Sequence, residues 1–176
     1  MKNKITLSGF AGSGKSTIGK AIAEKLNYDF ISVGNFSRKF ALDEYNMTIN
    51  EFQEKCKIDP ELDIMIDNKF REFCNSHSNL IIDYRLGFHF IKNAYHILLK
   101  VSDNVAYKRI NTANRSNEDA TIEAIKKRNE VMRNRFFDLY QLDFTAESNY
   151  DLIIDTDLRN TEDITELILQ SFNKTA

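Results

Sequence analysis

The sequence contains little of several features that mark particular classes of protein. Only two of its 176 residues are cysteines, Cys56 and Cys74, and their separation is not typical of metal ligands. Two isolated thiols suit a reducing compartment, where they pack as small apolar residues, so we expect no disulfide. No apolar run reaches the length of a membrane span, and the first apolar run is too short for a secretory signal. We therefore expect a soluble, cytoplasmic protein.

An excess of charge of one sign is also absent. The 24 basic and 26 acidic side chains leave a net charge of −2, so no overall basic field favours binding to nucleic acid or to an anionic membrane. The histidines show no metal-binding spacing, and packing roles are favoured for His77, His89 and His96. The 42% apolar content is that of an ordinary globular protein. We expect one domain over residues 1–176, acting as a monomer on small molecules.

Short β-prone runs alternate with helical stretches along the chain. Because parallel neighbours in a sheet need long crossovers, this alternation predicts an α/β fold of three layers, a five-stranded parallel sheet with helices on both faces. The continuously apolar character of the third and fourth runs is typical of central strands. The β-prone runs are 4–8, 28–32, 79–83, 95–101 and 150–155, and the helical stretches are 15–26, 36–45, 104–112, 121–140 and 161–172.

The single proline marks one further helix. Pro60 follows Asp59 and precedes Glu61, an order that is typical of a helix start with an Asx cap, proline in the first turn and an acid near the positive end of the helix dipole. The pattern predicts a buried face made of Leu62, Ile66, Phe70 and Phe73.

Residues 9–17 read GFAGSGKST, with the spacing Gly-x4-Gly-Lys-Ser. In this pattern backbone N–H groups surround a phosphate, because glycine permits the turn without a blocking Cβ. Lys15 adds a positive charge, Ser16 is placed to bind Mg²⁺, and the following helix directs its positive dipole end at the phosphates. The position between a predicted strand and a predicted helix favours this interpretation over a structural glycine turn. We assign binding of a nucleotide's phosphates, with Mg²⁺, to Gly9, Ala11, Gly12, Ser13, Gly14, Lys15, Ser16 and Thr17.

Polar residues follow the predicted strands at their carboxyl ends, where ligands collect in open α/β sheets. Gly34 and Arg38 follow the second run, Asp83 and Arg85 end the third, and Arg109 lies beyond the fourth. These residues are candidates for holding a second substrate. The alternatives are a solvated helix residue for Arg38 and a local ion pair between Asp83 and Arg85.

Arginine is concentrated in one part of the chain. Five of the nine arginines fall within 27 residues. Their guanidinium groups can bind phosphate in a bidentate manner that lysine cannot, so this concentration favours phosphate recognition. Arg128 and Arg135 are seven residues apart and share a helix face, whereas Arg133 points elsewhere and is expected at the surface. The five are Arg109, Arg115, Arg128, Arg133 and Arg135.

Together these segments resemble the small nucleoside monophosphate kinases, and within them the short, archaeal-type cytidylate kinases. The resemblance covers nearly the whole chain and implies a P-loop NTPase fold, with an acceptor-binding segment at 33–75 and a lid region at 113–136. It implies ATP-dependent phosphorylation of CMP or dCMP. It rests on GFAGSGKST, SVGNFSR, IDPELDIMID, IIDYRLGFHF, the arginines that precede FFDLYQLD, and YDLIIDT.

The resemblance also implies roles for the arginines and for Asp83. Gly34, Arg38 and Arg85 bind the acceptor, with the two arginines on its phosphate, and Arg109 lies against the donor adenine. Asp83 is implied beside the Mg²⁺ ion, through a water molecule. The catalytic set implied in this way comprises Lys15, Asp83 and the lid arginines Arg115, Arg128 and Arg135.

The chain departs from the family pattern in ways that leave the acceptor open. Tyr84 stands where the family has glycine or serine, and Gln141 replaces a glycine. Asp63 and Asp67 are candidates for reading a cytosine edge, and a solvated helix face is the alternative. Other acceptors remain possible: AMP, UMP, shikimate, gluconate or dephospho-coenzyme A. A nucleotide-binding regulatory module with little transfer activity is a further alternative.

Overall fold

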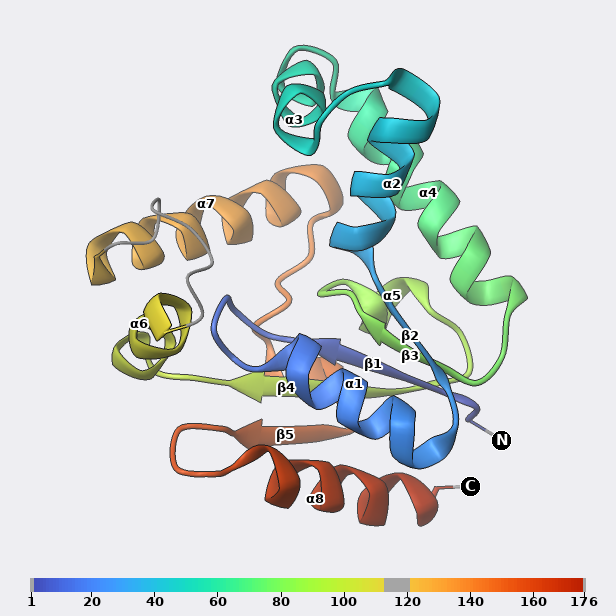
Figure 1. The fold of residues 1–176 in the computed structure, drawn as a ribbon, viewed down its shortest axis with the longest axis vertical. Coiled ribbons are helices and arrows are strands. Elements are labelled where there is room, and N and C mark those ends of the chain that lie inside the picture. Colours follow the sequence, from blue (N-terminus) through green and yellow to red (C-terminus); the bar gives the residue numbers. More distant parts are fainter. Residues whose placement is uncertain (1, 113–120, 176) are drawn as a thin grey trace.

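The computed structural model describes residues 2–112 and 121–175; Arg115 and the polar segment NRSNED lie outside these ranges. Its five strands form one sheet in the order β2-β3-β1-β4-β5, and each neighbouring pair is parallel (Figure 1). This confirms the predicted fold class and the central positions of the third and fourth runs. The strands are β1 (Lys4–Ser8), β2 (Asp29–Ser32), β3 (Leu80–Asp83), β4 (Ala94–Lys100) and β5 (Leu152–Asp155).

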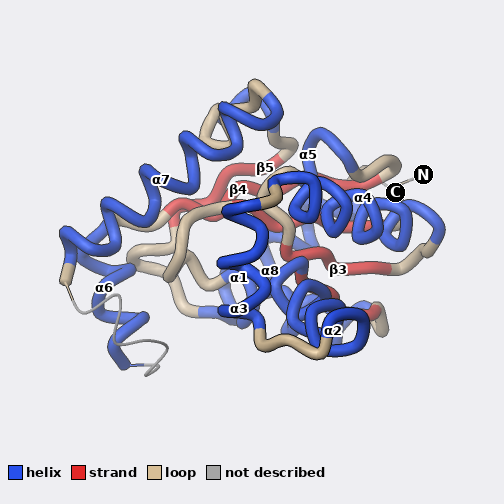
Figure 2. Tube along the Cα trace, turned by 90° about the horizontal axis from the view of Figure 1, so that it is seen from above, coloured by secondary structure: helices blue, strands red, loops and turns tan. Residues whose placement is uncertain are grey.

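Helices cover both faces of the sheet, and α2, α3 and α4 form a group at the top of Figure 1, with α7 running toward them. Seen from above, α7 lies on the left and α4 on the right of the molecule (Figure 2). None of the helices within the described ranges is both long and apolar enough to cross a membrane. The helices that match predicted stretches are α1 (Lys15–Leu26), α2 (Val33–Tyr45), α4 (Pro60–Ser76), α6 (Asp103–Thr112), α7 (Ile122–Tyr140) and α8 (Thr161–Asn173).

Three short elements are absent from the sequence prediction: α3 (Ile49–Ile58), α5 (Gly87–Phe90) and a 3-10 turn at Glu147–Asn149. The helix α3 begins with a capping box, because the Thr48 side chain accepts from the Glu51 N–H while the Glu51 carboxylate accepts from the Thr48 N–H. The Thr-x-x-Glu spacing is a sequence signal for a helix start and could have revealed this helix.

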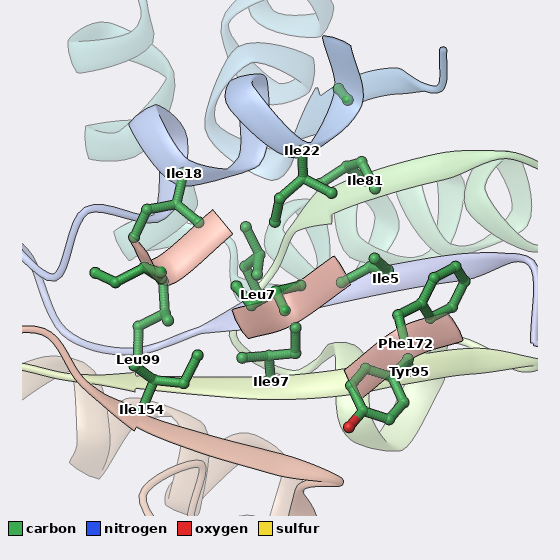
Figure 3. Packing of buried hydrophobic residues seen from close by; sticks show 13 residues of the cluster. Ile5, Leu7, Ile18, Ile22, Ile81, Tyr95, Ile97, Leu99, Ile154 and Phe172 are labelled. Atoms are coloured by element: carbon green, nitrogen blue, oxygen red, sulfur yellow. The ribbon is translucent and has the colours of Figure 1, made fainter. Parts of the chain in front are cut away.

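Alternate strand residues supply two separate cores. On one face Leu7, Ile81 and Ile97 pack beneath α1 and α8, and Figure 3 shows this cluster. On the other face Leu80 and Ile82 pack with side chains from α4, α5 and the segment after α7. Because successive strand residues point to opposite faces, the apolar run of β3 serves both cores at once. The sheet is thereby fixed from both sides, and its carboxyl edge presents the polar residues.

The start of α4 agrees with the prediction, and its buried face differs at one residue. Asp59 caps the helix, since its Oδ1 accepts from the Glu61 N–H at 3.2 Å. Phe73, predicted to be buried, is 37% exposed, and Cys74 is fully buried instead. Cys74 follows Phe70 by four residues and so continues the buried stripe, whereas Phe73 lies at the edge of this stripe and stacks on His77.

Candidate active site

The glycine loop packs too closely against its neighbours to carry side chains at two positions. A Cβ on Gly9 would collide with the carbonyl oxygen of Leu99, and one on Gly12 would lie 2.7 Å from the Cα of Ala106. Both glycines have positive φ, 138° and 78°, a region that L-residues with side chains rarely adopt. The spacing of the sequence motif therefore reflects how tightly the loop sits between β4 and α6.

Lys15 is buried inside this loop. Its Nζ donates to the carbonyl oxygens of Gly9 at 2.9 Å and Phe10 at 2.8 Å, and lies 3.4 Å from the hydroxyl of Ser13. A phosphate oxygen would offer the same ammonium group a charged and therefore stronger acceptor than these neutral oxygens. The loop thus holds the lysine in the place where a phosphate chain would meet it.

The predicted metal ligands lie in contact. Ser16, in the first turn of α1, donates from its hydroxyl to Oδ2 of Asp83, the last residue of β3, at 3.0 Å. Mg²⁺ prefers oxygen ligands and is usually held by one or two protein groups together with water and phosphate oxygens. The Ser16–Asp83 pair fits such an ion. Among residues 2–112 and 121–175, no group of three His, Cys, Asp or Glu side chains has metal-binding geometry.

Arg85 joins the acceptor side to the glycine loop. Its Nε donates to the carbonyl oxygen of Gly9 at 3.1 Å, and its own carbonyl accepts from the Ser8 hydroxyl at 3.1 Å. Burial lowers the pKa of Arg85, Asp83 opposes this shift, and the positive charge of Arg128 lowers the pKa further. The positive charge of Arg128 on α7 thus acts on Arg85, although the two residues come from distant parts of the chain. An anion between them would relieve their repulsion.

Arg109 reaches the loop from the other side. Its Nη1 donates to the Gly12 carbonyl at 3.3 Å and to Oγ1 of Thr156 at 2.9 Å, and Nη2 donates to the Thr156 carbonyl at 2.6 Å. This arginine on α6 therefore links the glycine loop to the segment after β5.

Other predicted site residues are held by protein side chains instead. Arg38 is exposed on α2 near Gly34, and its Nη2 donates to Oδ1 of Asn35 one turn earlier at 2.8 Å. Arg135 on α7 forms an ion pair with Asp63 on α4. Arg133 pairs with Asp143 at 2.5 Å and is half exposed, in line with its expected surface position.

A polar cluster between α4 and α7 contains a residue that the sequence analysis missed. Arg71 donates from Nε to the Tyr84 hydroxyl at 3.2 Å, and its guanidinium carbon lies 3.3 Å from the centre of the Phe90 ring. Asp67, four residues earlier, accepts from the Tyr140 hydroxyl at 2.7 Å. The spacing of Asp67 and Arg71 places them on one helix face, and this i,i+4 pairing was the available signal.

Residues 4–158 match the cytidylate kinase-like family. The chain belongs to this family. It is 35% identical over 164 residues to a cytidylate kinase of Methanosphaera stadtmanae, with 93% of this chain and 94% of that protein covered. It is 34% identical over 171 residues to a cytidylate kinase of Archaeoglobus fulgidus, covering 96% and 93% of the two chains.

A further relative of this cytidylate kinase-like chain carries a different name. The chain is 61% identical over 174 residues to an S-adenosylmethionine-dependent nucleotide dehydratase of Lacinutrix mariniflava. The match covers 99% of this chain, yet the chain spans only 37% of the length of that relative.

Solved structures agree on the fold. A shikimate kinase from Bacteroides thetaiotaomicron superposes with a TM-score of 0.68 at 19% identity, covering 97% of this chain and 98% of that one. A gluconokinase from Sinorhizobium meliloti gives a TM-score of 0.66 at 17% identity, covering 99% and 94% of the two chains. Family and fold together indicate a P-loop phosphotransferase, for which the family implies a nucleotide and a divalent metal ion as cofactors.

Proposed function

We propose that this chain transfers the γ-phosphoryl group of ATP to CMP or dCMP, with Mg²⁺ as the metal ion. The observation that carries the proposal is the 3.1 Å hydrogen bond from Arg85, the predicted acceptor arginine, to the carbonyl of Gly9 in the donor loop. A phosphotransferase must hold two phosphates close together and in line, whereas a protein that only binds ATP needs the loop alone. The contact therefore favours transfer over the alternative of a regulatory binding module.

In the proposed reaction the chain binds the donor and acceptor phosphates from opposite sides. The backbone N–H groups of the glycine loop and Lys15 hold the donor, while Arg85, with Arg38 and Gly34, binds the acceptor phosphate. Ser16 and Asp83 would hold Mg²⁺, which neutralises charge on the phosphate oxygens when bound. Phosphoryl transfer depends mainly on positioning and positive charge, so the reaction requires no general base from the protein.

The lid arginines complete the proposed site. We infer that Arg128 and Arg135, together with Arg115, move over the phosphoryl group in transfer and stabilise its negative charge. For Arg135 this requires release from Asp63. Closure over residues 113–136 also excludes water, which would otherwise accept the phosphoryl group in place of the substrate.

A nucleotide is favoured as the acceptor over a sugar acid or shikimate. Relatives that are at least a third identical to this chain over the matched residues include cytidylate kinases and a nucleotide dehydratase. The shikimate kinase and the gluconokinase share the fold at below 20% identity, which carries no information about the acceptor. We further propose a cytoplasmic monomer that acts without nucleic acid or membrane.

A coupled assay tests the proposal. ADP release would be followed with ATP and Mg²⁺ and with CMP, dCMP, UMP, AMP or GMP as acceptor; shikimate and gluconate serve as non-nucleotide comparisons. We expect the fastest turnover with CMP or dCMP. Absence of ADP above background with every nucleoside monophosphate would overturn the proposal, and turnover with shikimate or gluconate alone would replace it.

The relative from Lacinutrix mariniflava supports a second inference, about the use of the product. Because the chain matches part of a nucleotide dehydratase, we infer that its product supplies a dehydration reaction that depends on S-adenosylmethionine. The test uses that relative with the counterpart of Lys15 changed to alanine, together with CMP, ATP and S-adenosylmethionine. Adding this chain should restore dehydrated nucleotide. No restoration, while supplied cytidine diphosphate is dehydrated, would contradict the inference.

A further inference from the structure

Three polar residues lie one helical turn apart along α4, on the side that faces α7 and the end of β3. Asp63 pairs with Arg135, Asp67 accepts from the Tyr140 hydroxyl, and Arg71 donates to the Tyr84 hydroxyl. Residues four apart lie above one another on a helix, so the three form a single row. At one end of the row Asp63 contacts Arg135, a predicted lid arginine. At the other end Arg71 contacts Tyr84, which precedes Arg85.

Asp67 and Arg71, in the middle and at the end of this row, form an unusual ion pair. Their side chains are 17% and 14% exposed, whereas in six other ion pairs of the described residues both partners are at least 27% exposed. The distance from Arg71 Nη2 to Asp67 Oδ2 is 3.6 Å, too long for a hydrogen bond. Arg71 Nη2 is buried and has no hydrogen-bond partner.

The neighbours of Arg71 explain why it does not move closer to the carboxylate. The guanidinium carbon lies over the Phe90 ring, Nε donates to Tyr84, and Nη1 donates to Oδ1 of Asn68 at 3.2 Å. These contacts fix the plane of the group. The positive charge therefore acts on Asp67 without using up the hydrogen-bonding capacity of its carboxylate.

Asp67 keeps an oxygen that can accept a further hydrogen bond. Its Oδ2 accepts from Tyr140, while its Oδ1 accepts from none of the residues that the structure describes. Burial raises the pKa of Asp67, and the hydrogen bond from Tyr140 and the charges of Arg71 and Arg135 oppose this rise. A partly buried acceptor of this kind discriminates strongly between ligands. A ligand group that cannot donate a hydrogen bond displaces water from the carboxylate and leaves the oxygen without any hydrogen-bond partner.

We propose that Asp67 reads the base of the acceptor, accepting a hydrogen bond from the exocyclic amino group of cytosine, and that Arg71 is the positioning residue that holds Asp67 in place. Uracil presents a carbonyl oxygen where cytosine presents this amino group, so the carboxylate disfavours uracil. The position suits the role, because Arg71 donates to the hydroxyl of Tyr84, the residue next to Arg85, and Arg85 is the proposed phosphate ligand. The inference rests on the proposed function and adds to it the means of choosing the base.

The test compares CMP and UMP as acceptors for the wild-type chain and for Asp67→Asn. Asparagine keeps an acceptor for Tyr140 and replaces a carboxylate oxygen by an amide that can donate to the uracil carbonyl. We expect kcat/KM for CMP to fall by about 10- to 100-fold, a range typical of losing a hydrogen bond to a charged group. The value for UMP should fall less or rise, and KM for ATP should not change.

Arg71→Gln and Arg71→Lys test the positioning role. The glutamine variant should reduce the preference for CMP over UMP in the same direction as Asp67→Asn, and lysine, which keeps the charge, should restore part of it. Glu72→Gln, an exposed acid on the same helix, is the matched control and should leave the preference unchanged. A loss of stability alone would lower both activities together without changing their ratio.

The outcomes separate the two proposals. If the wild-type chain phosphorylates neither CMP nor dCMP, the proposed function fails and the inference fails with it. If CMP is phosphorylated and the preference for CMP over UMP stays the same in folded Asp67→Asn and Arg71→Gln, only the base-reading inference is overturned. Should Asp67→Asn not fold, the Arg71 variants give the same comparison.

Discussion

The two ends of the candidate site hold their positive charges in different ways. At the donor end Lys15 and Arg109 bond to backbone carbonyl oxygens of the glycine loop, and so does the predicted acceptor arginine Arg85 where the two ends meet. At the acceptor and lid end Arg38 and Arg135 bond to side chains, Asn35 and Asp63. A backbone partner is fixed by the path of the chain, whereas a side-chain partner can rotate away.

The difference suggests which half of the site is preformed. Loop carbonyls hold the donor-end charges beside the loop, so we expect the donor end to need little rearrangement when a nucleotide binds. The arginines of α2 and α7 must exchange a protein partner for a phosphate. Surface ion pairs cost little to break, so such an exchange is energetically easy. Lid closure would then consist largely of swapping partners.

The largest effect is expected at the preformed end. Lys15→Ala removes the charge that the loop surrounds, so both ATP binding and transition-state stabilisation are lost. We expect kcat/KM for ATP to fall on the order of 10⁴-fold in the coupled assay. Lys20→Ala, which removes an exposed lysine from the same helix, should have no effect. A loss of less than tenfold at Lys15 would show that the loop does not hold the transferred phosphoryl group.

Arg128→Ala tests the lid end. If Arg128 acts only on charge that develops during transfer, kcat should fall on the order of 10³-fold while KM for ATP changes little. Arg128→Lys should recover only part of the rate, because lysine lacks bidentate geometry. The neighbouring exposed lysine provides the control, Lys127→Ala. The proposed difference between the two ends would be contradicted if both alanine variants lost the same factor in kcat/KM and both showed a raised KM for ATP.

The sheet and most of the helices could be predicted from sequence because their signals are local. Apolar runs, the glycine loop and the Asp59 cap each act within a few residues. The helix α3 was missed because much of what stabilises it is tertiary: Phe52 and Cys56 are buried against Ala41 of α2 and Ile66 of α4. Its periodic pattern is short, and the capping box was the only strong local cue.

The site was predictable only in part, for a related reason. The contact of Ser16 with Asp83 follows from the parallel pairing of β1 with β3, which places their carboxyl ends together. The burial of Arg71 depends on Phe90 and Tyr84, which approach α4 from later parts of the chain. Apart from its i,i+4 spacing from Asp67, nothing in the local sequence around Arg71 distinguishes it from a solvated helix residue.

A smaller effect should follow from releasing a lid arginine before substrate arrives. Asp63→Asn removes the ion pair with Arg135, whose side chain is 51% exposed. An exposed pair of this kind contributes about 0.2–1 kcal/mol, so kcat or the acceptor affinity should improve by roughly 1.4- to 5-fold. The control is Glu130→Gln, an exposed acid on α7. A lower kcat in Asp63→Asn would mean that Asp63 orients Arg135 for catalysis and does not restrain it.

The smallest expected effect concerns the sheet that leads into the glycine loop. It should change the free energy of unfolding and leave activity unchanged. His96 lies in β4, with Nδ1 2.8 Å from the Thr6 hydroxyl of β1. Burial lowers the pKa of His96. The charge of Asp151 opposes this shift, and the charge of Lys2 lowers the pKa further. Below the usual histidine pKa of about 6.5 the unfolded chain therefore binds a proton that the folded chain does not. The free energy of unfolding should decrease as the pH falls below about 6.5, and above this pH the contribution of His96 is complete.

Urea unfolding at pH 7, 6 and 5 should show a steeper loss of unfolding free energy for the wild type than for His96→Gln. The exposed histidine variant His77→Gln should follow the wild type, and parallel curves for all three proteins would show that His96 binds its proton equally in both states.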